Sequence, residues 1–96
     1  MKVIQTKKSP EAIGPYSQAI KTDKYIFTSG QIGINPSSGK LIRNSLEDEI
    51  MQIFKNLENI LIEGGTSIHK IVKLNVYMLD LKNFDILNKI LKNLLN

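Results

Sequence analysis

Two short segments carry most of the side chains that could take part in chemistry. The first is IGPYSQA at residues 13–19, and the second is TSGQIG at residues 28–33. Each mixes hydroxyl groups, an amide and glycine with apolar residues. A glycine N–H lets a ligand approach the backbone closely, and serine and tyrosine hydroxyls can orient that ligand. The pattern therefore indicates a small polar pocket, with a turn at Gly14-Pro15 and a β-bulge at Gly30 as the structural alternative.

Other reactive side chains are scarce. The chain has no cysteine and one histidine, His69, so thiolate catalysis and metal sites with two histidine ligands are excluded. His69 is expected in a loop. Asn88 lies among apolar positions of a predicted helix, beside Phe84 and Leu87. An amide there needs hydrogen-bond partners, which are either nearby backbone groups or a ligand in a pocket.

The elements that must position these residues follow from turn signals and hydrophobic spacing. Short strands are expected at residues 3–6, at 16–20 and from Tyr25 onward, with a hairpin turn at residues 21–24. A helix should begin after Ser45, whose side chain can cap it together with Asp48, and should end at Gly64-Gly65.

The rest of the chain predicts one further strand and one further helix. Residues 71–79 alternate apolar and polar side chains as a strand does, and Asp80 can cap a second helix that runs to Leu95. Its expected apolar stripe comprises Phe84, Leu87, Leu91 and Leu95. Strands, helix, strand and helix in this order predict one α+β or α/β domain over residues 1–96, with helices on one face of a sheet.

Composition limits the possible partners. The net charge is +4, but the lysines are scattered and Arg43 is the only arginine. A nucleic-acid surface would cluster its basic residues among aromatic ones, so a nucleic-acid partner is not expected. Neither a secretory signal nor an apolar run of membrane-spanning length is visible. We therefore expect a cytoplasmic protein without a membrane association.

Together these segments make the chain resemble the Rid (RidA/YjgF) family, the reactive intermediate deaminases. The similarity is carried by IGPYSQAI, YIFTSGQIGINPSSGKL, the helix ending LIEGG, IVKLNVYMLDLKNF and Asn88, in one order along nearly the whole chain. It implies a chorismate-mutase-like α+β fold, in which a mixed β-sheet is backed by two α-helices, and a homotrimer with pockets between subunits.

The same resemblance implies an activity. Family members hydrolyse 2-imino acids such as 2-aminoacrylate to 2-oxo acids and ammonia, and they need no cofactor. By position, Tyr16, Ser29, the backbone of Gly30 and Asn88 would line the substrate pocket. No metal site is expected.

The chain departs from the family pattern at its C-terminal end. Family members continue with two further strands, which carry an arginine that binds the substrate carboxylate and a glutamate that handles the water. This sequence ends at Asn96, and Arg43 lies in the loop before the first helix, so it cannot replace that arginine. We therefore expect a Rid-like domain over residues 1–96 that is truncated at its C-terminus, with unassigned catalytic residues and unpaired strand edges.

Three functions remain open on this basis. The first is deamination of 2-imino acids, and the second is a non-catalytic trimer that binds or senses a small ligand. The third is the endoribonuclease or translation-inhibitor activity attributed to some family members. No pair of acid and base residues suited to RNA cleavage is visible, so the sequence supports the third function least.

Overall fold

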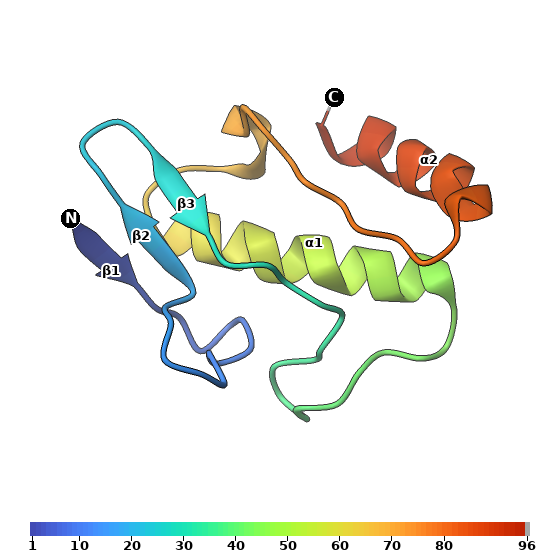
Figure 1. The fold of residues 1–96 in the computed structure, drawn as a ribbon, viewed down its shortest axis with the longest axis horizontal. Coiled ribbons are helices and arrows are strands. Elements are labelled where there is room, and N and C mark those ends of the chain that lie inside the picture. Colours follow the sequence, from blue (N-terminus) through green and yellow to red (C-terminus); the bar gives the residue numbers. More distant parts are fainter. Residues whose placement is uncertain (96) are drawn as a thin grey trace.

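The computed structural model describes residues 1–95 and shows an α+β arrangement, as predicted (Figure 1). Helix α1 lies behind the strands with its C-terminal part, and α2 lies beside its other end. No helix in residues 1–95 combines the length and the apolar character needed to cross a membrane. The elements in chain order are β1 (Lys2–Ile4), β2 (Ala19–Lys21), β3 (Ile26–Thr28), α1 (Leu46–Glu63), the 3-10 helices η1 (Ile68–Lys70) and η2 (Leu81–Asn83), and α2 (Phe84–Leu95).

The three strands form one antiparallel sheet in the order β1-β2-β3. Val3 pairs with Ile20, and Ile20 pairs with Phe27. Side chains alternate between the faces of a sheet. Ile4 and Ala19 are buried on the α1 side, whereas Val3, Ile20 and Phe27 form a row on the opposite face, here called the outer row. The mixed sheet that we expected is not present among the described residues, because both pairings are antiparallel.

Helix α1 has the ends that the sequence predicts. The Asp48 N–H donates to the Ser45 hydroxyl oxygen over 3.1 Å, which caps the first turn. At the other end, the N–H of Gly64 donates to the carbonyl of Ile60 over 3.0 Å. The Lys21 ammonium donates to the Gly64 carbonyl over 2.8 Å. Because the last turn of α1 has no basic residue, Lys21 supplies the positive charge that favours a helix C-terminus.

Two apolar clusters hold the layers together. One joins the sheet to α1 through Ile4, Ala19 and Ile60. The other joins α1, η1 and α2, and its buried members are Ile50, Phe54, Leu61, Ile68 and Leu87. Both clusters include residues of α1, so this helix is the element against which the sheet, η1 and α2 pack.

The prediction of a strand at residues 71–79 is wrong. The segment is stretched out in Figure 1, but it is not paired with any strand among the described residues. Leu74 and Met78 pack against the α1–α2 cluster, whereas Val72 and Tyr77 are 86% and 92% exposed. Alternating side chains favour a strand, but a strand also needs a hydrogen-bonded neighbour, which this segment lacks.

Asp80 caps the short η2, and α2 itself begins later than predicted, at Phe84; of its predicted apolar stripe, only Leu87 and Leu91 face inward. The Asp80 carboxylate accepts from the N–H of Lys82 over 2.9 Å, and the helical segment then runs to Leu95. Leu87 is buried as expected, but Phe84 is 53% exposed and Leu95 is also exposed. The half-buried residues on the inward face are Ile86, Ile90, Leu91 and Leu94.

Candidate functional site

Tyr16 and Gly30, two of the four predicted site residues, lie around one small hollow of about 50 Å³. It is formed where the segment at residues 10–13 meets the segment at residues 30–34. The two motif segments singled out in the sequence therefore meet in space, because the pairing of β2 with β3 brings them together. The residues that line the hollow are Pro10, Glu11, Ala12, Ile13, Tyr16, Gln18, Gly30, Gln31 and Ile34.

The ring of Tyr16 is positioned by a tight turn. The Tyr16 N–H donates to the Gly14 carbonyl over 2.8 Å, which closes a three-residue turn around Pro15. The fixed φ of proline suits the central position of such a turn. A Cβ at Gly14 would lie 3.1 Å from the tyrosine ring, so glycine gives the ring its room. Tyr16 remains half exposed at the edge of the hollow.

Gly30 is the glycine that the fold does not explain. Gly39 and Gly65 have φ values of 73° and 88°, a region that favours glycine. A Cβ at Gly33 or Gly64 would approach a side chain to 2.8 or 2.7 Å. At Gly30, φ is not positive and a Cβ would have no neighbour within 4 Å. The predicted bulge does not account for it either, since β3 already ends at Thr28.

Ser29 is tied to the neighbouring strand rather than to the hollow. Its hydroxyl donates to the Ser17 carbonyl, and its N–H donates to the Gln18 carbonyl over 2.9 Å. It is absent from the residues that line the hollow. Its hydroxyl proton is therefore used within the chain, and its oxygen keeps lone pairs that can accept a hydrogen bond.

Asn88 does not join the other predicted site residues. It lies on α2, which packs against α1, η1 and η2 at the end of the molecule away from the strands (Figure 1). Its side chain is exposed, so our expectation that it needs partners within an apolar face is wrong. Within one chain, the hollow contains Tyr16 and Gly30 without Asn88.

Sequence reasoning missed that three polar residues in or next to the hollow are buried. Ser9, Gln18 and Asn56 are 1%, 4% and 0% exposed. One signal was available for Asn56, because it stands inside the apolar stripe of α1 between Phe54 and Leu57. Gln18 belongs to the first motif, but its type alone did not reveal whether its amide faces a ligand or the backbone.

The hollow offers hydrogen-bonding groups on a partly apolar surface. These are the Tyr16 hydroxyl, the amide of Gln31, the Gly30 backbone and the Glu11 carboxylate, whereas the Gln18 amide is already hydrogen-bonded to the backbone of Thr6 and Pro10. In residues 1–95, no group of three or more His, Cys, Asp or Glu side chains is arranged to hold a metal ion. The hydrogen-bonding groups of the hollow can orient a small polar molecule. An open groove of about 450 Å³ along α1, lined among others by Met51 and Phe54, shares no residue with this hollow.

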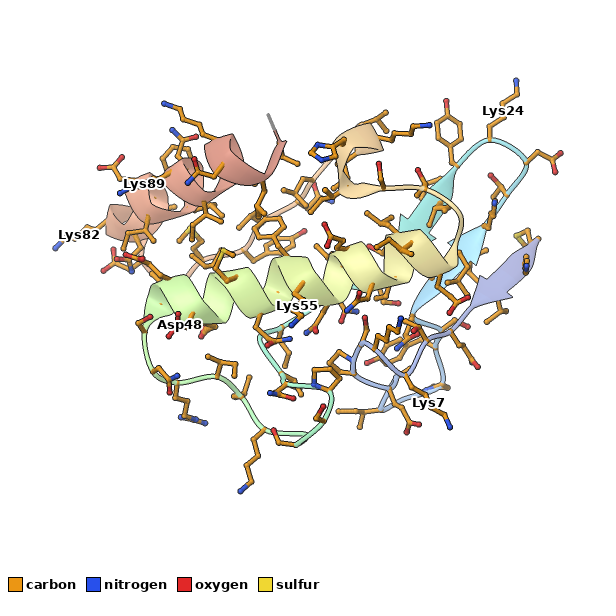
Figure 2. The ribbon with its side chains drawn as sticks, turned by 180° about the vertical axis from the view of Figure 1, so that it is seen from behind. Lys7, Lys24, Asp48, Lys55, Lys82 and Lys89 are labelled. Atoms are coloured by element: carbon orange, nitrogen blue, oxygen red, sulfur yellow. The ribbon has the colours of Figure 1, made fainter. Side chains whose placement is uncertain are left out.

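The positive charge is spread over the molecule. The lysines labelled in Figure 2 project from different parts of the chain along its whole length. They are Lys7, Lys24, Lys55, Lys82 and Lys89, which belong to two loops, α1, η2 and α2. This spread matches the scattered lysines of the sequence and differs from a continuous basic surface.

Comparison with known proteins gives a consistent result. The family model described as Endoribonuclease L-PSP matches residues 6–96. A RutC family protein of Aquifex aeolicus is 47% identical over 90 residues, which cover 94% of this chain and 71% of that protein. The 2-iminobutanoate/2-iminopropanoate deaminase of Mus musculus is 45% identical over 91 residues, which cover 95% of this chain and 67% of that protein.

A solved structure agrees over the entire fold. The crystal structure of RidA from the Antarctic bacterium Psychrobacter sp. PAMC 21119 matches with a TM-score of 0.95 at 36% identity. The match covers 100% of this chain and 77% of that one. The chain therefore has the fold of these proteins and spans roughly two thirds to three quarters of their lengths.

Proposed function

Since this chain belongs to the endoribonuclease L-PSP family, in which the Rid proteins are found, we propose that it hydrolyses 2-imino acids to 2-oxo acids and ammonia. The observation that carries the proposal is the hollow shared by Tyr16 and Gly30, together with a glycine at position 30 that the fold itself does not need. A relative named as a 2-iminobutanoate/2-iminopropanoate deaminase supports the choice of substrate class.

The chemistry asks little of the protein beyond positioning. Water adds to the electrophilic carbon of the C=N bond, the C–N bond then breaks, and ammonia leaves as the C=O bond forms. The protein must hold the substrate, orient one water and keep other nucleophiles away. We assign the backbone N–H of Gly30 and the Tyr16 hydroxyl to substrate binding. We also assign the Ser29 hydroxyl oxygen, which can still accept a hydrogen bond although Ser29 lies outside the hollow of one chain. No cofactor enters this scheme.

One chain does not form a complete pocket. The hollow of about 50 Å³ is far smaller than the roughly 300–1,000 Å³ of ordinary ligand sites. Asn88, which we also assign to substrate binding, lies on a distant face of the same chain. A second copy could bring its α2 to the hollow and enclose the substrate. We therefore propose a homotrimer whose pockets lie between subunits.

The surface of the sheet supports such an assembly. The outer row of Val3, Ile20 and Phe27 turns away from α1, and two of its three members are more than half exposed. Tyr25 lies next to it, with ring centroids 6.2 Å from Phe27. Covering these side chains with another copy would remove apolar surface from water, which favours association.

The substrate carboxylate needs a cationic partner that the hollow does not contain. Its lining residues include the Glu11 carboxylate but no lysine or arginine. A carboxylate beside the pocket repels an anionic substrate. A cation from another subunit would bind the substrate carboxylate. Its position would then determine how the imino acid is oriented relative to the attacking water.

Two alternative functions remain testable. A trimer that binds 2-oxo or 2-imino acids without turnover would use the same hollow. The family description names an endoribonuclease, which is the observation in favour of RNA cleavage. Against it, His69, the single histidine, is exposed in η1 and does not line the hollow.

The deciding experiment follows pyruvate release from 2-aminoacrylate. A serine dehydratase generates the imine, and the purified, folded chain is added at increasing concentration. Acceleration is expected for the parent, and it should be lost for Gly30→Val and reduced for Tyr16→Phe. Tyr77→Phe serves as the matched control because Tyr77 is 92% exposed outside the hollow.

The other outcomes separate the alternatives. Binding of 2-oxobutanoate without acceleration would favour the non-catalytic trimer. Cleavage of a single-stranded RNA that persists in Gly30→Val, with no imine hydrolysis, would place another activity elsewhere on the chain and contradict the proposal.

A further inference from the structure

The pairing of β2 with β3 brings the two walls of the hollow together, and buried side-chain amides hold each wall in place beyond the paired strands. One wall comes from the segment after β1, and the other from the segment after β3; neither is part of the sheet. We infer that Gln18 and Asn56 are positioning residues, whose amides fix these two walls and thereby the distance between Tyr16 and Gly30.

Gln18 holds the first wall. Its Oε1 accepts from the N–H of Thr6 over 2.6 Å, and its Nε2 donates to the Thr6 carbonyl over 3.0 Å and to the Pro10 carbonyl over 2.8 Å. A longer contact of 3.3 Å joins the same nitrogen to the Ser9 carbonyl. The side chain thus replaces the hydrogen bonds of a missing strand neighbour, and Pro10 lines the hollow itself.

Asn56 holds the second wall from the middle of α1. Its Nδ2 donates to the Ile34 carbonyl over 2.9 Å and to the Ile32 carbonyl over 3.3 Å. Its Oδ1 accepts from the Nε2 of Gln52 over 2.9 Å, one helical turn earlier. The two carbonyls flank Gly33, whose close approach to Glu49 brings the same segment against α1.

The two anchors are linked through α1. The Ser9 hydroxyl donates to the Asn56 carbonyl over 2.7 Å, so the segment held by Gln18 is also tied to the residue that holds the opposite wall. Every fully buried side-chain nitrogen and oxygen in residues 1–95 has a hydrogen-bond partner. Breaking one of these bonds would leave a buried polar group unsatisfied, which is costly, so the geometry of both walls is strongly fixed.

This inference about geometry stands on the hydrogen bonds alone, whereas its consequence for substrate rests on the proposed function. A misplacement of about 1 Å between binding groups can reduce catalysis by about 10²-fold. Gln18 and Asn56 should therefore influence substrate handling mainly through the positions of Gly30 and Tyr16, and kcat/KM should fall more than the stability of the fold would explain.

The test measures amide hydrogen exchange in the whole chain for Asn56→Leu, which keeps the volume but removes the amide. The reporter is the Ile42 N–H, which donates to the Gly33 carbonyl over 2.8 Å in the second wall. The reference is the Ile60 N–H within α1. Local release of the wall should speed exchange at Ile42 by at least about tenfold more than at Ile60. Global destabilisation would raise both equally.

Two further variants keep the test decisive. Asn59→Ala is the matched control, since Asn59 lies on the same helix and its amide donates only to the exposed Lys8 carbonyl, over 2.9 Å. Gln52→Ala removes the partner of the Asn56 Oδ1 while leaving Asn56 in place, and it should give a smaller effect of the same kind if Asn56→Leu does not fold. If the exchange rates at Ile42 and Ile60 change equally in Asn56→Leu and in Gln52→Ala, the inference is overturned.

A parallel activity measurement distinguishes the positioning role from the proposed function. If the parent hydrolyses 2-aminoacrylate, Asn56→Leu and Gln18→Glu should lower kcat/KM by about 10²-fold, and Asn59→Ala should leave it unchanged. A parent without activity would contradict the proposed function, and the exchange result would still decide the positioning role of Asn56.

Discussion

The Ser9 hydroxyl donates a hydrogen bond of 2.7 Å to the backbone carbonyl of Asn56, which lies 47 positions later in the chain. Both residues are almost completely buried. The contact joins the irregular segment after β1 to the centre of α1. Together with the hydrogen bonds from Gln18, this contact fixes the loop against α1 next to the hollow that contains Tyr16 and Gly30.

Replacing Ser9 by alanine should lower stability measurably. The variant loses one buried hydrogen bond, worth about 1 kcal/mol. For a chain of this length, such a loss lowers the Tm by roughly 4–8 °C. Thermal unfolding followed by circular dichroism measures the shift. Ser37→Ala, at an exposed loop position, is the control that should leave the Tm unchanged; an unchanged Tm for Ser9→Ala would contradict the role of this contact.

Alanine at Gly30 and at Gly33 should separate a functional glycine from a structural one. A Cβ at Gly30 meets no atom within 4 Å, so Gly30→Ala should fold with stability within about 0.5 kcal/mol of the parent. A Cβ at Gly33 would lie 3.0 Å from the backbone carbonyl oxygen of Glu49, which cannot move aside easily. Gly33→Ala should lose about 1–3 kcal/mol in urea unfolding.

Ligand binding should rank the two variants in the opposite order to stability, with Gly30→Ala the more affected. Gly30→Ala should bind 2-oxobutanoate more weakly than the parent, because the added methyl group stands where we place the substrate. Titration by NMR of both folded variants provides the comparison. Normal binding by Gly30→Ala would show that the substrate does not approach this part of the backbone.

Local signals determined which parts of the fold were predictable. Ser45, Asp48 and Gly64 mark the ends of α1 through contacts within a few residues, and these ends are confirmed. The state of residues 71–79 depends on a neighbouring strand, which the alternation of side chains cannot reveal. The orientation of α2 likewise depends on α1, so Phe84 was wrongly placed on its buried face.

The same difference between local and long-range contacts applies to the candidate site. The segments that contain Tyr16 and Gly30 were singled out for their residue types, and the family resemblance assigned these two residues to the pocket. The short hairpin between β2 and β3 brings the two segments together. Asn56 holds backbone carbonyls 22 and 24 positions away, so its role depends on tertiary structure. Asn88 lies on α2, and one chain alone cannot bring it to Tyr16. Its predicted role therefore depends on assembly and not on the fold of a single chain.

The buried face of α1 gives a graded stability prediction. Ile60 is 0% exposed between the sheet and the helix, whereas Leu57 is only half buried. Ile60→Ala should cost about 2–5 kcal/mol, and Leu57→Ala less, because its surroundings are partly open to solvent. Urea unfolding of both variants measures the difference. An equal or larger loss for Leu57→Ala would show that the α1–α2 cluster is packed more tightly than its exposure indicates.

The outer row gives a prediction about assembly, which rests on the proposed trimer. Phe27 is 64% exposed on the edge strand β3, in the outer row that α1 does not cover. If copies of the chain associate through this face, Phe27→Asp buries a charge in the interface, and an unpaired buried charge is strongly unfavourable. Sedimentation velocity should show a trimer for the parent and a shift to monomer for Phe27→Asp.

A matched aromatic variant separates loss of assembly from loss of folding. Tyr77→Asp introduces the same charge at a residue that is 92% exposed away from the sheet, and it should leave the trimer intact. Helical content of Phe27→Asp should remain close to that of the parent, since its side chain makes no contact with the α1 cores. A monomeric parent would contradict the trimer. A trimeric Phe27→Asp would show that the copies meet through a different surface. A different part of the neighbouring copy would then have to enclose the hollow at Tyr16.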